Sequence, residues 1–346
     1  MLGHLSKQCH SPQVICIGEA LLDRLGPLGG NPLHDQPYED RLGGAPANVA
    51  CGLAKLGNSV AFFGRLGSDS IGECFQDLFN ARAINLNGLQ IDQSRPTRIV
   101  LVRRDLSGER SFQGFLGDKG DGFADQALST DDFPEACNLI IRHARSLLIG
   151  TIPLANKTSE DALLWCIDRA LETNIQIVLD INWRSTFWGE NNIPDSGPSQ
   201  KEVANIKPLF EKASLLKLAK EEANWFFSCD DPKQISLSLF RQPDVVITDG
   251  PNPVKWLIGG FSGATDAVAP KVVVDTTGAG DSFTAGLINQ LLRLSFKPET
   301  YKEAEAVVEF AAACGSLVCT GSGAIDPQPT SQEVLACLSG SFGGDK

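Results

Sequence analysis

The sequence predicts an α/β protein whose central, mostly parallel sheet is covered by helices on both faces. Apolar runs such as 14–23 and 244–250 alternate with segments of helical periodicity, and strands separated by helices favour a parallel sheet. Residues 97–116 break this alternation, because two period-2 segments flank a polar turn. They predict a β-hairpin and with it a small accessory sheet. The 346 residues suffice for one large domain.

The individual elements follow from apolar runs and from helix start and stop signals. The first strand, 14–23, is expected to end near Asp23, and the Ala-rich helix 42–57 opens at a glycine pair and stops at Gly57. We assign residues 1–13 to a flexible tail and 14–340 to a single domain. Further strands are expected at 59–67, 145–154, 175–183 and 244–250, helices at 71–84, 159–174 and 303–320, a strand and then a helix start in 213–227, and a strand, a glycine-rich turn and a helix in 272–294.

Composition narrows the functional classes. The formal net charge is −12, and an acidic chain is a poor candidate for binding nucleic acid or anionic membranes. The ten cysteines form no C-x-x-C pair and only four histidines occur, so we expect neither a disulfide framework nor a zinc site. No segment approaches 18 apolar residues, and the N-terminus has no apolar signal-like region. We expect a cytoplasmic enzyme without nucleic-acid or membrane partners.

The segment 275–286, Asp-Thr-Thr-Gly-Ala-Gly-Asp-Ser-Phe-Thr-Ala-Gly, carries the strongest functional signal. A glycine-rich turn at a helix N-terminus presents free N–H groups and the positive end of the helix dipole to an anion. The dinucleotide pattern G-x-G-x-x-G fails at Phe283, and the chain contains neither a P-loop nor a G-x-S-x-G elbow. Asp281 directly follows this anion cradle, where a carboxylate can serve as the base of phosphoryl transfer. From spacing alone, Asp281 could equally be a helix cap.

This segment closely resembles the C-terminal motif of the ribokinase-like (pfkB) carbohydrate kinases, and the resemblance spans about residues 13–335. It implies the ribokinase-like fold, with a small β-sheet that acts as a lid and includes segments at about 24–42 and 97–116. It also implies ATP-dependent phosphorylation of a sugar hydroxyl, with Asp281 as the base. The anion hole would consist of Gly278, Ala279 and Gly280.

A second family motif, Gly-Gly-Ala-Pro-Ala-Asn, occupies residues 43–48. The resemblance implies that Gly43, Gly44 and Asn48 hold sugar hydroxyls. It implies the same for Asp23, for which a loop or cap role is the alternative. The segment from Asp180 to Arg184 matches the D-x-N-x-R pattern of fructokinases and 2-keto-3-deoxygluconate kinases, so Arg184 is a candidate for binding phosphate or substrate; a surface ion pair is its alternative.

The two motifs favour fructose as the substrate over ribose. The tyrosine-arginine pair that fructokinases often carry in the accessory segment is replaced here by Phe-Leu-Gly-Asp at 115–118. Therefore 2-keto-3-deoxygluconate, ribose or a nucleoside remains an alternative substrate. A sugar- or nucleotide-binding protein that has kept the fold without catalysis is the alternative from a different class.

The resemblance also implies a site for ATP and a site for Mg²⁺. In many family members a further site binds a monovalent cation such as K⁺. Glu222 would act on Mg²⁺ through water, and Asp275 and Thr277 would bind a monovalent cation. The lid often forms a dimer surface in the family, which makes a homodimer possible here. The residues expected beside the nucleotide are Lys217, Thr248, Gly250, Cys314, Gly321, Gly323 and Ala324. For Lys217, a place on a solvated face is the alternative.

Overall fold

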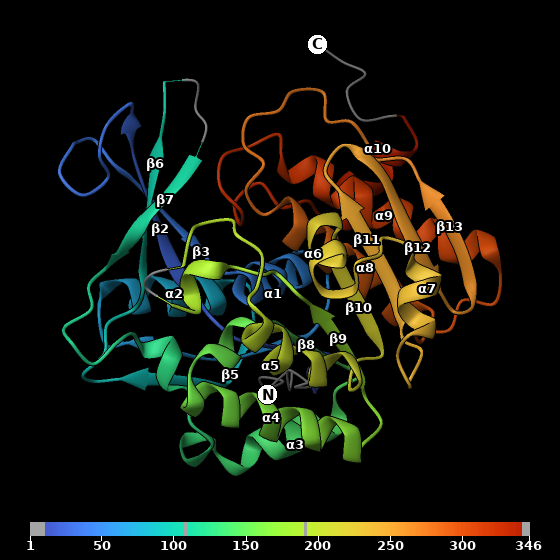
Figure 1. Cartoon of the computed structure of the whole chain (residues 1–346), viewed down its shortest axis with the longest axis horizontal. Coiled ribbons are helices and arrows are strands. Elements are labelled where there is room, and N and C mark those ends of the chain that lie inside the picture. The colour runs from blue at the N-terminus through green and yellow to red at the C-terminus, as the bar shows by residue number, and fades with distance from the viewer. Residues whose placement is uncertain (1–10, 107–109, 190–191, 341–346) are drawn as a thin grey trace, which may run out of the picture.

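The computed structural model describes residues 11–106, 110–189 and 192–340, so most of the predicted tail 1–13 lies outside the described residues. At its centre is a nine-stranded sheet of order β13-β12-β11-β10-β9-β8-β1-β4-β5 (Figure 1). Neighbouring strands are parallel except at β11–β12 and β12–β13. The strands are β1 (Val14–Ile17), β4 (Val60–Gly67), β5 (Asn85–Asp92), β8 (Ser146–Ile149), β9 (Gln176–Asp180), β10 (Leu215–Ala219), β11 (Asp244–Asp249), β12 (Asn252–Ile258) and β13 (Phe261–Thr265).

Helices cover both faces of this sheet, as the sequence predicts. Successive residues of β1 point to opposite faces: Val14 and Cys16 enter one apolar core, and Ile15 and Ile17 enter the other. The first core contains side chains of α1 (Ala45–Lys55), α2 (Ser70–Ala81), α8 (Ala279–Arg293), α9 (Tyr301–Val318) and α10 (Ser331–Leu338). The second contains side chains of α3 (Glu135–His143), α4 (Lys157–Glu172), α5 (Gln200–Phe210), α6 (Lys220–Phe227) and α7 (Pro232–Leu237).

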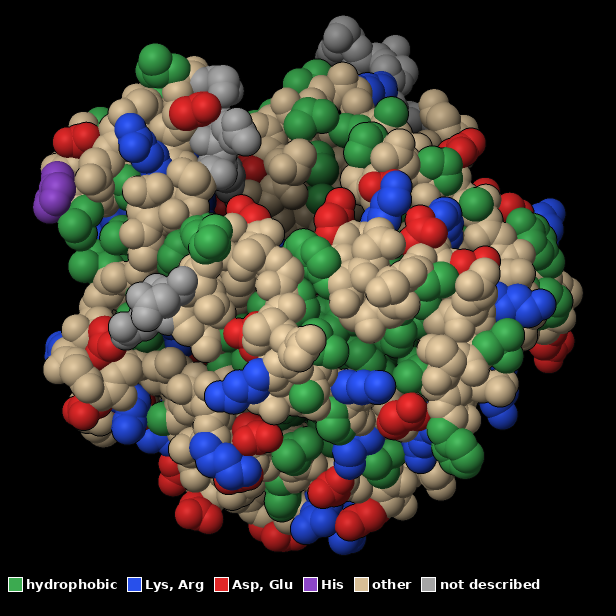
Figure 2. All heavy atoms as spheres, viewed as in Figure 1, with side chains coloured by type: hydrophobic (Ala, Val, Ile, Leu, Met, Phe, Trp, Pro, Cys, Tyr) green, Lys and Arg blue, Asp and Glu red, His purple; other side chains and the backbone are tan. Residues whose placement is uncertain are grey.

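A second sheet, here called the small sheet, consists of β2 (Leu21–Leu28), β3 (Glu39–Gly43), β6 (Ile99–Arg104) and β7 (Arg110–Leu116) in the order β3-β2-β6-β7. The predicted hairpin is confirmed, because β6 and β7 pair antiparallel. The small sheet lies beside the main body (Figure 1). Figure 2 shows that the surface is hollowed between the small sheet, at upper left, and the C-terminal half of the chain, at upper right.

Two strand predictions are wrong. The apolar run 14–23 is not one strand, because the chain leaves the central sheet after β1 and enters the small sheet at β2. Asp23 therefore lies within β2, paired with Arg41 of β3 and Val100 of β6. Residues 272–274 form no strand either, and their side chains are exposed. Their β-branched residues have high strand propensity, but no neighbouring strand is paired with them.

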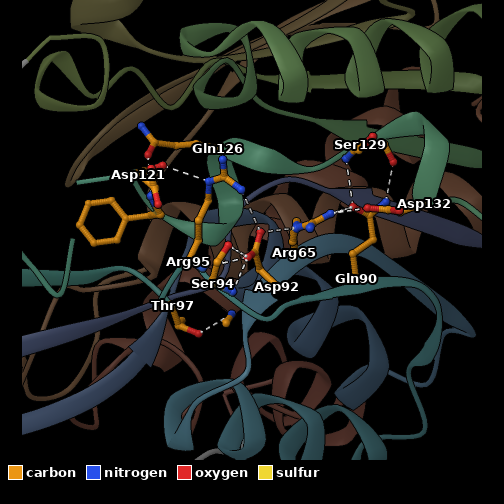
Figure 3. A network of polar contacts seen from close by, with 12 residues as sticks. Arg65, Gln90, Asp92, Ser94, Arg95, Thr97, Asp121, Gln126, Ser129 and Asp132 are labelled. Atoms are coloured by element: carbon orange, nitrogen blue, oxygen red, sulfur yellow. Dashed lines mark hydrogen bonds and ion pairs between the residues drawn. The ribbon is translucent and has the colours of Figure 1, made fainter. Parts of the chain in front are cut away.

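The junction between the two sheets is a network of charged and polar side chains at the end of β5 (Figure 3). Asp92 accepts hydrogen bonds from the backbone N–H groups of Ser94 and Arg95 and from the guanidinium of Arg65 on β4. The next segment is anchored too, since Thr97 donates its N–H and its hydroxyl proton to Asp69. These hydrogen bonds thus hold the backbone of the segment that joins β5 of the central sheet to β6 of the small sheet.

Candidate active site

The turn before α8 has the geometry of an anion hole. Gly278 is the N-cap of α8 and has φ of 78°, a left-handed conformation that favours glycine. A Cβ on Gly278 would lie 2.5 Å from Cβ of Ala324, so the turn packs against the 321–324 loop. The first N–H groups of α8 have no carbonyl partner one turn earlier in the helix. Ala279 and Gly280 are the first two helical residues, and the N–H of Ala279 donates to the carbonyl oxygen of Thr276 at 3.2 Å. This end of α8 is therefore a candidate anion site, in which a bound anion would replace Thr276 as the partner of that N–H.

Asp281 does not cap α8. Within the part of the chain that the structure describes, no backbone N–H of α8 donates to the Asp281 carboxylate, which instead accepts a hydrogen bond from Asn48 Nδ2 at 2.8 Å. Burial raises the pKa of Asp281, while the Asn48 amide and the charges of Lys217 and Arg184 oppose the rise. The carboxylate therefore lies within one turn of the anion hole, with its proton affinity raised as a base requires.

The Gly-Gly motif packs closely against β2 and the residues before it, and Asn48 one turn later contacts Asp281. Gly44 has φ of 99°, and a Cβ there would lie 2.7 Å from the carbonyl oxygen of Glu19. A Cβ on Gly43 would lie 2.8 Å from Asp23 Oδ2, which places the Asp23 carboxylate against this turn. Asn48 is 5% exposed, and its Oδ1 is a buried acceptor without a hydrogen-bond partner among the described residues. A ligand hydroxyl at this position would satisfy it.

Glu19 is a buried carboxyl that sequence reasoning missed. It is 3% exposed, and its Oε1 accepts the backbone N–H of Ala45 at 3.1 Å, which fixes the start of α1. Burial raises the pKa of Glu19 to about 8, with smaller contributions in the same direction from Asp125 and Asp281. The sequence carries no signal for this burial, since Glu19 simply follows the apolar residues of β1.

Arg184 is exposed and reaches towards the same site from the loop after β9. Its Nη1 donates to the carbonyl oxygen of Trp183 at 3.0 Å, and no ion pair to it is found among the described residues. The surface ion pair considered as its alternative role is therefore not formed there. Its charge acts on the pKa of Asp281, which places the guanidinium near the candidate base.

Lys217 does not lie on a solvated face: its side chain is 9% exposed and its Nζ lies 3.2 Å from Asp180 Oδ1. A Cβ on Gly280 would lie 3.4 Å from this Nζ, so the ammonium lies beneath the anion hole. Burial lowers the pKa of Lys217, but the carboxylates of Asp180, Glu222 and Asp281 outweigh burial and raise it. The site therefore contains a permanent cation.

Glu222 is bound within the fold. Both of its oxygens accept backbone N–H groups, from Trp183 and from Ala219, at 2.7 Å each. The residue is 5% exposed, and burial raises its pKa. That Glu222 acts on Mg²⁺ through water stays a prediction. Among the described residues no group of three or more His, Cys, Asp and Glu side chains could hold a metal ion.

The residues expected beside the nucleotide fall into two groups. Thr248 and Gly250 lie at the end of β11, where Asp249 forms an ion pair with Lys220 at 2.8 Å. The second group, Gly321, Gly323 and Ala324, lies in one loop, in which the N–H of Gly323 donates to Asp275 Oδ2 at 2.9 Å. The N–H and hydroxyl of Thr277 both donate to Asp275 Oδ1, so Asp275 organises the turn in which a monovalent cation was expected.

Cys314 lies elsewhere than expected. It is fully buried, and a Cβ on Gly286 would lie 2.8 Å from its Sγ, which places the thiol between α9 and α8. Burial raises its pKa far above the ordinary value. The apolar pattern of α9 identifies an inward-facing residue but not what it faces, and Cys314 faces a neighbouring helix rather than the surface.

Comparison with known proteins shows the family to which the chain belongs. The pfkB family carbohydrate kinase model matches residues 11–331. "Probable fructokinase-6, chloroplastic" of Arabidopsis thaliana is 32% identical, over 95% of this chain and 83% of its own length. "Probable fructokinase-7" of the same plant is 31% identical, over 94% and 92%. The structure of a Vibrio cholerae O395 fructokinase with fructose, ADP and calcium bound is 26% identical, with a TM-score of 0.77 over 95% and 99% of the two chains. The chain belongs to the pfkB family of carbohydrate kinases.

Proposed function

We propose that this protein is an ATP-dependent kinase that transfers the γ-phosphoryl group to a hydroxyl of fructose. The observation that carries the proposal is the placement of one carboxylate, Asp281, between the helix N-terminus at Gly278–Gly280 and the polar turn at Gly43–Gly44. A general base must lie within reach of both the attacking hydroxyl and the group that it attacks. The hollow between the small sheet and the main body supplies room for the substrates.

In the proposed reaction, Asp281 accepts the proton of the acceptor hydroxyl as its oxygen attacks the γ-phosphorus. The amides at Gly278, Ala279 and Gly280 stabilise the charge on the transferred oxygens, and the buried ammonium of Lys217 adds a fixed positive charge. Mg²⁺ bound with ATP would neutralise phosphate charge, and Glu222 would act on this ion through water.

The acceptor sugar is assigned to the polar turn. Asp23, Gly43, Gly44 and the unsatisfied Oδ1 of Asn48 supply a carboxylate, backbone groups and an amide oxygen, which suit several hydroxyls. Arg184 is proposed to bind phosphate or substrate oxygens from the open side. Fructose is favoured because the relatives named above are fructokinases; 2-keto-3-deoxygluconate, ribose and nucleosides are the alternatives.

The nucleotide is assigned to the wall formed by Thr248, Gly250 and the loop from Gly321 to Ala324. A monovalent cation such as K⁺ is proposed beside the turn that Asp275 and Thr277 organise. The structure of a Vibrio cholerae fructokinase variant with fructose, ADP and potassium bound supports this proposal. Cys314 is left out, because its thiol is enclosed between helices.

The small sheet is proposed to act as a lid over the sugar and as the surface of a homodimer. Its exposed apolar side chains favour the second role: Leu28 is 58% and Leu106 is 85% exposed. The described residues include no helix long and apolar enough to cross a membrane. We still predict that this acidic protein acts on small metabolites in the cytoplasm.

A sugar panel tests the proposed function. ATP turnover is measured with fructose, ribose, 2-keto-3-deoxygluconate and adenosine as acceptors, and fructose is expected to give the highest kcat/KM. A tenfold higher kcat/KM for another acceptor would replace fructose but keep the kinase. Sugar or nucleotide binding without turnover on any acceptor would instead favour the non-catalytic binding protein.

A further inference from the structure

One buried ion pair joins three elements of the fold at the floor of the candidate site. Asp180 is the last residue of β9 and is paired in register with Lys217 of β10, so their side chains share one face of the sheet. Asp180 Oδ1 contacts Lys217 Nζ at 3.2 Å, and Asp180 Oδ2 accepts the hydroxyl proton of Thr284 at 2.7 Å. Thr284 belongs to α8 and is completely buried. Each oxygen of the Asp180 carboxylate therefore has a partner, the ammonium of Lys217 for Oδ1 and the hydroxyl of Thr284 for Oδ2.

Both partners of Asp180 lie next to the groups assigned to phosphoryl transfer. Thr284 follows Asp281 by three residues, so the two side chains lie on one face of α8. Lys217 Nζ lies beneath Gly280. Of the two other carboxylates near this ammonium, Glu222 is occupied by backbone N–H groups and Asp281 by Asn48. The hydrogen-bonded carboxylate partner of Lys217 among the described residues is Asp180.

Stability does not account for this arrangement. A buried ion pair contributes little net stability, because the loss of hydration offsets the attraction between the charges. An apolar pair would fill the same space at lower cost. The ion pair does, however, hold one ammonium in a fixed place relative to the helix that bears the base, and such preorganised charge is what a phosphoryl-transfer site needs.

We propose that Asp180 is a positioning residue of the kinase: its two oxygens fix the Lys217 ammonium under the anion hole and tie it, through Thr284, to the helix that carries Asp281. This inference rests on the proposed function. Asp180 touches neither the reacting hydroxyl nor the nucleotide. It acts through Lys217, whose charge is aimed at the γ-phosphoryl group during transfer.

Asp180→Asn tests the proposal, because it keeps the shape and removes the charge. A displaced catalytic group costs up to about 10²-fold in rate, so kcat is expected to fall by about 10- to 100-fold while KM for fructose changes less than threefold. In the Lys217→Met background, the same substitution is expected to lower kcat by less than threefold further, because residues that act as a unit are not additive. A kcat within twofold of wild type for Asp180→Asn, or full additivity with Lys217→Met, contradicts the proposal.

Matched variants separate positioning from folding. Asp244→Asn alters the first residue of β11, at the opposite end of the parallel strands from Asp180, where it accepts the N–H of Gly259. This variant is expected to leave kcat unchanged even if it lowers Tm. Thr284→Val removes the hydroxyl donor and is expected to lower kcat, whereas Thr284→Ser retains it and is expected to restore most of the rate. Equal kcat for the Val and Ser variants, at equal Tm, contradicts the role of this bond.

A binding measurement keeps the inference distinct from the proposed function. If the wild type phosphorylates no acceptor, the proposed function fails. The role of Asp180 is then tested by calorimetric titration with Mg²⁺ and a non-hydrolysable ATP analogue. Asp180→Asn is expected to weaken binding of the analogue at least fivefold and binding of ADP less than twofold, since Lys217 is aimed at the γ-phosphate. Equal losses for both ligands, or none for either, contradict the inference.

Discussion

Asn48 donates a hydrogen bond from its side-chain amide to Asp281 Oδ2 at 2.8 Å, joining residues 233 positions apart in the chain. One end of this bond lies in the first turn of α1 and the other in the first turn of α8. A direct hydrogen bond therefore joins the proposed acceptor site to the proposed base. The predictions below begin with its two partners.

Asp281→Asn is expected to abolish most of the kinase activity. The substitution keeps the shape of the side chain and removes the base, and loss of a general base costs about 10²–10⁴ in rate. Steady-state kinetics should show this fall in kcat with little change in KM for the sugar. Because Asp281 does not cap α8, a thermal melt should show little change in Tm. A variant that retains more than half of the wild-type kcat would refute the mechanism.

Asn48→Leu is expected to move the acidic limb of the pH profile to higher pH. The Asn48 amide stabilises the ionised form of Asp281 and so opposes the rise that burial causes in its pKa. Without that donor the pKa of Asp281 rises further, and the base loses its charge at a higher pH as the solution is acidified. The dependence of kcat/KM on pH measures the shift. A limb at the wild-type position would mean that the base is not Asp281 or that Asn48 does not act on it.

Glu19→Gln is expected to stabilise the protein at pH 8 but not at pH 5. Burial raises the pKa of Glu19 from 4.5 to about 8, so the folded state retains a proton that the unfolded state releases. Wild-type stability therefore falls as pH rises from about 4.5 to about 8, at most by about 1.4 kcal/mol per pH unit. Glutamine keeps an oxygen for the N–H of Ala45 and has no proton to lose. The difference in Tm between variant and wild type, measured at both pH values, should grow with pH; a constant difference contradicts the assignment.

Gly278→Ala is expected to lower kcat sharply. Alanine at φ of 78° is strained, and its methyl group would clash with Ala324, so the anion hole must shift; a shift of about 1 Å costs up to about 10²-fold in rate. Gly260→Ala is the matched control, because Gly260 has φ of 86° and open space around its added methyl. Both variants should lose about 1–2 kcal/mol from backbone strain, measured by denaturant unfolding. Only Gly278→Ala should lose activity, and equal kcat for the two variants would exclude a role for this turn.

The sequence predicted the alternating fold and the glycine turn well, because both depend on local patterns. The helix expected at 42–57 is α1 at Ala45–Lys55, and the strand expected at 59–67 is β4 at Val60–Gly67. The sequence did not reveal where β1 ends and β2 begins. Apolar residues continue across this point, although the chain passes there from the central sheet to the small sheet. At this break the chain lies against the first turn of α1, since a Cβ on Gly18 would lie 2.6 Å from Cγ of Pro46, and no local pattern reveals such a tertiary contact.

Site residues were predictable where a motif carries them and not where the sheet brings them together. Asp281, Gly278 and Asn48 stand in recognisable segments. The link from Asp180 to Thr284 spans 104 residues and depends on the order of strands and on the face that α8 turns inward, neither of which a local pattern reveals. Glu19 was missed for a similar reason, since a carboxyl next to an apolar strand gives no sign that it will be buried.

The place of β1 in the sheet bears on how the chain can fold during synthesis. β1 lies between β4 and β8, so the strand made first reaches its full pairing only after about 150 residues have left the ribosome, and long-range pairing of this kind is slow. The side-chain amide of Asn48 can bond to Asp281 only later, after α8 has left the ribosome. A nascent chain can therefore assemble most of the sheet while it still lacks the carboxylate proposed to do the chemistry.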